Sequence, residues 1–201
     1  MSKLLAMMMS GGGGQKKVLN LEPVNGATYD SNYIMTGTTT SDNCPYFITK
    51  EKIDLRNTAN KIELKMKFMA TSTGSGFFKA DISQTDWNKF CSCYVSGASQ
   101  LWVSINGSYG SYSTVSLNSW IWLKITKPAN SNYYTVERSI DGITYYNVYS
   151  KNADDINEMY MTFGYGASTG STYGMHGKID FRETDIKIND QSVLWVEQEQ
   201  Q

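Results

Sequence analysis

The sequence predicts one all-β domain, a two-sheet antiparallel sandwich, carried behind a flexible N-terminal arm. Its 201 residues include 14 Tyr, 7 Phe, 5 Trp and 17 Gly but only 3 Pro. Aromatic residues suit a pleated, half-buried surface, and Gly suits the turns between strands. Apolar and polar residues alternate through many short segments, and no helical period is sustained over about ten residues. Without crossover helices, the chain is expected to pack sheet on sheet around one sizeable core.

The N-terminal segment, residues 1–17, differs in composition and is predicted to be an anchoring arm. Its predicted docking residues are Leu4, Leu5, Met7, Met8 and Met9. Four consecutive glycines follow at 11–14 and normally form a hinge. The apolar stretch is shorter than the roughly 7–15 residues of a secretory signal, so we expect synthesis in the cytoplasm. We expect the apolar residues to dock into a partner subunit; a disordered leader is the alternative.

Alternation of apolar and polar residues predicts the sandwich over residues 18–198, with a short tail at 199–201. The clearest strand is 61–68, where Ile62, Leu64 and Phe68 share one face and lysines occupy the other. In 120–127, Ile121 and Leu123 share one face. The other predicted strands are 18–21, 33–35, 46–49, 76–82, 89–95, 100–105, 132–140, 143–150, 158–166, 178–181, 185–188 and 192–196.

Short turn motifs punctuate these strands. Asp141-Gly142 predicts a hairpin with a two-residue type I′ turn, which needs positive φ at both positions. Asn189-Asp190 predicts a second tight turn. Segments 53–59 and 154–158 are each expected to hold a turn or a single helical turn.

Charge and cysteine content exclude several classes of partner. The net charge of −1, from 18 basic and 19 acidic residues, gives no field that attracts nucleic acid or an anionic membrane. No apolar run approaches the roughly 20 residues of a membrane span. Cys91 and Cys93 are expected on one side of a strand, a poor disulfide geometry, and Cys44 leaves an odd number. With His176 as the only histidine, we expect structural thiols and not a zinc site.

Several segments of the chain form a recognisable set: 61–68, 120–125, 139–145, Gly177-Lys178-Ile179-Asp180-Phe181, 185–190 and Trp195. Together they resemble the concanavalin A-like lectin/glucanase superfamily. The resemblance is closest to laminin G-like jelly rolls of phage tail and head-fibre proteins, and it implies a jelly-roll sandwich. Gly177 would allow close approach to a neighbouring strand, while Ile179 and Phe181 point inward.

The superfamily also includes glycoside hydrolases, so the carboxylates need testing. These enzymes carry a strand resembling Glu-x-Asp-x-x-Glu, whose acids share one face. The nearest segment here has Glu183 and Asp185, but Ile188 stands where the second glutamate would be. We therefore expect Glu183 and Asp185 at a solvated strand edge and no enzymatic activity. A polysaccharide-degrading enzyme with an unrecognised carboxylate site is the alternative.

Sugar binding is the chemistry that the loops suit best. Lectins stack an aromatic ring on a pyranose and hold its hydroxyls with Asn, Asp and backbone groups. The predicted carbohydrate-binding residues are Trp102, Asn106, Tyr109, Tyr112, Asn118 and Trp120. A second tyrosine-framed loop spans 165–173. The competing interpretation is that these rings pack the sheets or a subunit interface.

No cofactor is expected, although the resemblance leaves calcium open. Some members of the superfamily hold calcium at loop aspartates, and Asp141, Asp154, Asp155 and Asp190 are the candidates here. No stretch repeats acidic residues at alternating positions as a strong calcium loop does.

The arm and the resemblance together predict a bacteriophage virion protein. The lectin-like domain would dock to other virion proteins through residues 1–17 and display its loops to a host-surface glycan, or decorate the shell. It would be made in the host cytoplasm and leave with the particle. By analogy with fibre proteins we expect a homo-oligomer; head or tail location stays open. A free bacterial carbohydrate-binding module is a third hypothesis.

Overall fold

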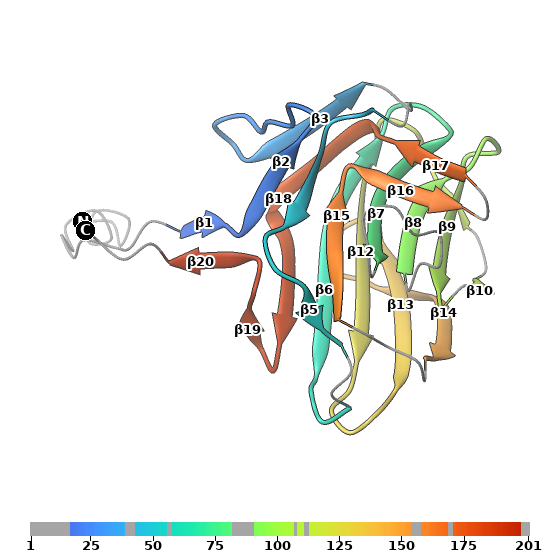
Figure 1. Ribbon diagram of the computed structural model, residues 1–201. Coiled ribbons are helices and arrows are strands. Elements are labelled where there is room, and N and C mark those ends of the chain that lie inside the picture. The colour runs from blue at the N-terminus through green and yellow to red at the C-terminus, as the bar shows by residue number, and fades with distance from the viewer. Residues whose placement is uncertain are drawn as a thin grey trace, which may run out of the picture.

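The computed structural model describes residues 17–38, 43–55, 58–81, 91–106, 108–110, 113–153, 158–168 and 171–197. Within these ranges the chain forms only strands and turns, and all paired strands run antiparallel. Two large sheets pack face to face as a sandwich (Figure 1). The predicted fold class is confirmed. The described part of the chain contains no helix that could cross a membrane.

One sheet has nine strands in the order β10-β9-β8-β7-β15-β4-β2, with β11 paired to β9 and β5 paired to β15. Its strands are β2 (Leu21–Val24), β4 (Tyr46–Thr49), β5 (Ile53–Asp54), β7 (Ser75–Asp81), β8 (Cys91–Val95), β9 (Gln100–Ile105), β10 (Ser108–Tyr109), β11 (Ser113–Thr114) and β15 (Glu158–Phe163). Strand β5 lies where a turn or helical turn was predicted.

The other sheet has seven strands in the order β14-β13-β12-β6-β18-β19, with β3 also paired to β18. Its strands are β3 (Ile34–Thr38), β6 (Ile62–Ala70), β12 (Trp120–Lys127), β13 (Tyr133–Ser139), β14 (Tyr146–Asn152), β18 (His176–Ile188) and β19 (Gln191–Ser192). Strand β12 lies between β6 and β13. Its outward side chains therefore have a neighbouring strand on each side and do not lie at an edge of the sheet.

Two short ribbons complete the fold. Strands β1 (Lys17–Leu19) and β20 (Trp195–Glu197) pair, and this ribbon projects from the left edge of the sandwich (Figure 1). Strands β16 (Tyr165–Ser168) and β17 (Ser171–Gly174) form a hairpin that lies against β7 and β8. The two described ends of the chain therefore leave the domain side by side.

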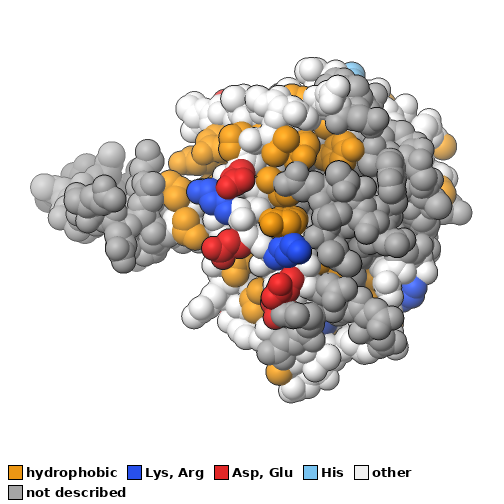
Figure 2. Space-filling model, viewed as in Figure 1, with side chains coloured by type: hydrophobic (Ala, Val, Ile, Leu, Met, Phe, Trp, Pro, Cys, Tyr) orange, Lys and Arg blue, Asp and Glu red, His pale blue; other side chains and the backbone are white. Residues whose placement is uncertain are grey.

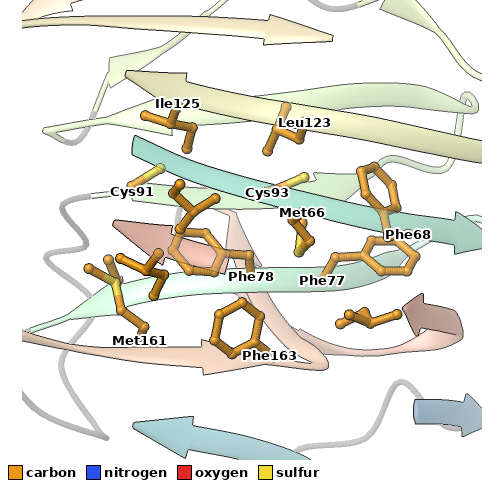
Figure 3. Packing of buried hydrophobic residues seen from close by; sticks show 14 of the residues in the cluster. Met66, Phe68, Phe77, Phe78, Cys91, Cys93, Leu123, Ile125, Met161 and Phe163 are labelled. Atoms are coloured by element: carbon orange, nitrogen blue, oxygen red, sulfur yellow. The ribbon is translucent and has the colours of Figure 1, made fainter. Parts of the chain in front are cut away.

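The core forms where the inward faces of the two sheets meet. Every second residue of β6 is buried, as the alternation predicts. Phe68 of β6 packs on Phe77 of β7, with ring centroids 4.5 Å apart, and the rings and thioethers of both sheets interdigitate (Figure 3). Cys91 and Cys93 lie in this core as free thiols, as predicted, and burial raises the pKa of Cys91 to about 12. Such apolar burial is the main source of the fold's stability.

Strand β18 differs from its prediction. The two predicted strands, 178–181 and 185–188, form one continuous strand with an irregularity between Asp180 and Asp185. A Cβ at Gly177 would lie 3.0 Å from Phe77 Cε1 and closer still to the Met69 carbonyl, which confirms the predicted close approach.

The two predicted turns have different outcomes. Asn189 and Asp190 both have positive φ, of 51° and 66°, and join Ile188 directly to Gln191 across a tight turn. The hairpin of β13 and β14 forms as predicted, but among Asp141 and Gly142 only Gly142 has positive φ, 75°. The type I′ prediction was wrong there, because the connection is longer than two residues and is organised by the Asp141 side chain.

Candidate functional site

Strand β12 places two indole rings next to each other on the outer face of the seven-stranded sheet. Ile121 between them is buried in the core, so Trp120 and Trp122 share the outward side and are half-buried. Lys67 stands on the neighbouring strand β6 directly opposite Trp122. Its Nζ lies 5.0 Å from each ring centroid, so one ammonium group contacts both rings by cation–π interaction.

Glu183 of β18 fixes this arrangement from the other side. Its Oε1 lies 2.5 Å from Lys67 Nζ, and its Oε2 accepts a hydrogen bond of 2.7 Å from Trp122 Nε1. The hydrogen bond from Lys67 is the main cause that lowers the pKa of Glu183 below its ordinary value. A carboxylate held at both oxygens fixes the orientation of the Trp122 ring.

Asp180 supports the same lysine from within the sheet. Its side chain is 2% exposed, and burial alone would raise its pKa. Hydrogen bonds from Arg182, at 2.9 Å from Nε and 2.7 Å from Nη2, together with the charge of Lys67, lower that pKa instead. Both carboxylates beside Lys67 are therefore ionised at neutral pH.

A groove of about 570 Å³ opens beside this tryptophan pair. It lies where β12 begins, between the segment that follows β11 and the tip of the β13–β14 hairpin. Its lining residues are Thr114, Val115, Ser116, Asn118, Ser119, Trp120, Ile121, Trp122, Arg138 and Ile140. The groove exists because β13 pairs with β12 only as far as Ser139 opposite Trp122, which leaves the beginning of β12 without this neighbour.

The two walls of the groove are held by local hydrogen bonds. On one side Asn118 adopts a left-handed conformation, with φ of 61°, and its backbone N–H donates to the Ala70 carbonyl at 2.7 Å. On the other side Asp141 Oδ1 accepts from the amides of Ile143 and Thr144, both at 2.8 Å, and from Ser139 Oγ at 2.7 Å. These backbone hydrogen bonds hold the pKa of Asp141 well below its usual range. The turn at the hairpin tip is thus fixed by its own residues.

The predicted sugar-binding residues separate into two regions. Asn118 and Trp120 line the groove together. Trp102 stands on β9 in the other sheet, where its ring lies 5.7 Å from that of Tyr94, and Asn106 occupies the exposed turn after β9. The six predicted residues are close in the sequence. The chain, however, passes from the nine-stranded sheet to the seven-stranded sheet between β11 and β12, which separates Trp102 and Asn106 from Asn118 and Trp120.

Other predictions lie partly beyond what the structure describes. Tyr109 belongs to β10, but its side chain is outside the described set, and Tyr112 lies outside the described residues. The predicted docking residues Leu4, Leu5, Met7, Met8 and Met9 also lie outside them. In the second tyrosine loop, the Tyr165 ring stacks on Tyr46 at 5.3 Å, so it already has a partner within the domain.

Sequence reasoning missed the residues that complete the groove. Trp122 carried a usable signal, because a second tryptophan two positions after Trp120 must share its face of a strand. Arg138 and Ile140 carried none, since their place beside Trp120 depends on the pairing of β12 with β13. Lys67 and Glu183 likewise come from separate strands.

The carboxylates considered for hydrolysis are engaged in structural contacts. Glu183 and Asp185 lie in the part of β18 between its pairing with β3 and its pairing with β19, and both side chains are partly exposed. Glu183 holds Lys67 and Trp122, while Asp185 accepts from Ser192 Oγ at 2.5 Å. Both carboxylates are thus committed to contacts within the fold.

The aspartates considered for calcium are dispersed. Asp141 organises its own turn, and Asp190 forms an ion pair of 2.6 Å with Lys61 at the opposite end of the sheet. Asp154 and Asp155 lie outside the described residues. Among the residues that the structure describes, no three His, Cys, Asp or Glu side chains gather as a metal site.

The fold has clear relatives among solved structures. No protein-family model and no curated protein sequence matches the chain. The exoplasmic domain of VIP36, in a Ca²⁺/Man3GlcNAc-bound form, is 9% identical with a TM-score of 0.55, covering 87% of this chain and 85% of that one. Basic winged bean lectin with Tn-antigen is 13% identical with a TM-score of 0.53, covering 86% and 96%.

A heptameric pentraxin from Limulus polyphemus is similar at 12% identity and a TM-score of 0.52, covering 80% of this chain and 76% of that one. At these identities the likeness concerns the fold alone. The chain therefore has the jelly-roll sandwich of the concanavalin A-like lectins and pentraxins. A lectin fold can carry many functions, so function has to be argued from the groove.

Proposed function

We propose that this protein is a carbohydrate-binding domain and that the groove beside Trp120 and Trp122 is its sugar site. The observation that carries the proposal is the meeting, in one groove, of two indole rings with Asn, Ser and Thr side chains; Glu183 fixes the Trp122 ring. Indole rings stack on the apolar face of a pyranose, and amide and hydroxyl groups bind its hydroxyls. The groove's volume falls within the usual range for small-molecule sites.

The similar structures support this proposal at the level of fold. Two of them are described with a bound Man3GlcNAc and with Tn-antigen respectively. We propose binding without catalysis, because Glu183 and Asp185 already hold structural partners. Incubation of the protein with a broad polysaccharide panel should release no new reducing ends.

The test is glycan-array binding by three variants. Trp120→Ala should lose about tenfold or more of the affinity for any glycan bound, since a stacked ring contributes roughly 1–2 kcal/mol. Ser119→Trp, at an exposed lining position, should block the groove without removing a core contact. Trp102→Ala is the matched control in the other sheet and should bind normally.

Circular dichroism and melting temperature establish that each variant is folded. Loss of binding in Trp102→Ala but not in Trp120→Ala or Ser119→Trp would move the site to β9. Failure of the wild-type domain to bind any glycan would end the proposal.

We further propose that the domain is displayed on a virion, anchored through residues 1–17. What supports this is the apolar and glycine-rich composition of the arm and the position of the ribbon to which it connects. The β1–β20 ribbon lies on the β18 side of the sandwich, while the groove lies beyond β6 at β12 and β13. An anchor there would leave the groove free to face a host surface.

The surface beside the ribbon is suited to contact with a partner. Figure 2 shows hydrophobic side chains with interspersed charges on the side next to the ribbon. Tyr29 and Val196 are exposed, and Tyr29 stacks on Tyr33, which packs against Trp195. Deletion of residues 1–14 should prevent incorporation into particles without changing glycan binding. Incorporation of the deleted protein would refute the anchoring role.

A further inference from the structure

One charged side chain lines the groove, and it is positive. Arg138 lies one residue before the end of β13, opposite the inward-facing Leu123 of β12, and is half-buried. The other lining residues are apolar, aromatic, hydroxyl or amide side chains, and none of the described lining residues is acidic. A guanidinium binds a carboxylate more strongly than it binds a neutral hydroxyl, so Arg138 bears on the class of ligand.

The charges around Arg138 are already satisfied by one another. Lys124 pairs with Glu137 at 2.8 Å, and Lys67 pairs with Glu183. Asp141, close in the sequence, is occupied by two amides and a hydroxyl of its own turn. Across the ranges that the structure describes, no carboxylate forms an ion pair with Arg138.

We infer that the groove binds a sugar unit that bears a carboxylate, such as a uronic or nonulosonic acid, with Arg138 as the group that recognises the carboxylate. The inference rests on the proposed carbohydrate function and names its ligand class. A guanidinium presents a planar fork that matches a carboxylate with two parallel hydrogen bonds. Trp120 and Trp122 supply the stacking surface.

The near-zero net charge is compatible with this ligand. A net charge of −1 gives no long-range attraction for a polyanion. Recognition by Arg138 acts only at contact distance, so it selects a carboxylate in the groove without general affinity for anionic polymers. Binding should therefore depend on the sugar and weakly on total ligand charge.

The experiment compares each acidic glycan with its own carboxyl-reduced form, which keeps the ring, the stereochemistry and the linkages. The panel contains uronic-acid oligosaccharides and sialylated oligosaccharides, measured by isothermal titration calorimetry. The wild-type domain should bind at least one acid about tenfold or more tighter than its reduced form. Arg138→Gln should remove that preference by weakening binding of the acid much more than binding of the reduced form, and Arg138→Lys should keep part of the preference.

Lys50→Gln is the control for charge. It removes the same charge from an exposed position after β4, in the other sheet, and should leave the preference intact. Polyglutamate should not compete, because it offers carboxylates without a sugar ring.

The outcomes separate the two proposals. Equal affinity for acid and reduced form, both abolished by Trp120→Ala, would overturn the role of Arg138 and leave the sugar site standing. A preference that survives Arg138→Gln, or is lost equally in Lys50→Gln, would also overturn it. Absence of binding to every glycan would instead refute the proposed function itself.

Discussion

The two outer faces of the sandwich differ in how far their polar side chains are buried. On the nine-stranded sheet, Thr162, Lys79, Ser92 and Ser104 form one row across four strands, and each is at most 3% exposed. On the seven-stranded sheet the corresponding row of Asp185, Lys65, Lys124 and Glu137 is partly exposed. The first face lies against the β16–β17 hairpin; the second meets solvent.

The difference teaches where a binding site can form. Beneath the hairpin, polar groups bond within the fold: Ser92 and Ser104 share a hydrogen bond of 2.8 Å, and Thr162 donates to the Lys79 carbonyl. Buried polar groups require such partners, so little hydrogen-bonding capacity is left for a ligand. On the open face charged groups pair at low cost and hold the tryptophans in place, which leaves the groove accessible.

The largest difference in stability between the two faces is expected from substitution of Ser92. Replacement by Leu should destabilise the fold by about 3 kcal/mol, because the added volume must displace the covering hairpin and Ser104 loses its partner. Lys65→Leu, at an outward position of the open face, should change stability by no more than about 0.5 kcal/mol. Urea unfolding measures both. Equal costs would show that the two faces are covered to the same extent.

The second largest effect is expected at Lys67. Lys67→Met removes the ion pairs to Glu183 and Asp180 and should cost about 2 kcal/mol at neutral pH, a value reduced by the partial exposure of Glu183. Lys124→Met, whose pair with Glu137 is more exposed on the lysine side, should cost less than about 1 kcal/mol.

Acid should reduce the difference between wild type and Lys67→Met. The folded-state pKa values of Asp180 and Glu183 are lowered, so their contribution is present above the unfolded value of about 4 and is lost as the pH falls through the folded values. Unfolding measured at neutral pH and near pH 3 gives the comparison. A difference that stays constant would mean that these carboxylates do not stabilise the fold through Lys67.

The smallest effect concerns the tip that forms one wall of the groove. Asp141→Ala removes the acceptor for the Ile143 and Thr144 amides. These amides should exchange with solvent several-fold faster, with global stability changed less than in Lys67→Met. In the wild type, the lowered pKa keeps Asp141 ionised and the tip ordered at pH values where an ordinary Asp is protonated. Unchanged exchange would show that other contacts fix the tip.

Turns show how far local sequence can predict structure. Asn189-Asp190 and Asp141-Gly142 are both turn dipeptides between alternating strands. The first forms a tight turn with both φ values positive, and the second does not. The difference lies in Ser139 and Asp141, whose side chains bond to backbone amides and build a longer connection. Dipeptide propensity does not contain that information.

The site shows the same limit over longer distances. Asn118 and Trp120 line one groove, and their proximity follows from their local spacing at the beginning of β12; their role in binding stays a prediction. Trp102 was predicted beside them but stands on the other sheet, and its role in binding stays a prediction to be tested with Trp102→Ala. The place of Arg138 in the groove could not be predicted from the sequence, since an arginine on a strand indicates no site until its spatial neighbours are known.

The sequence by itself determined the sandwich, many of the strand positions and the inward faces of β6 and β12, because alternation is a local property of the chain. It also determined the thiols in the core and the close approach at Gly177. Only the tertiary structure decided which outer face is covered and which residues meet at the groove. Lys67, Trp122 and Glu183 come from three strands, and Glu183 is 61 positions from Trp122. Their contacts depend on strand order and register, which no local pattern specifies.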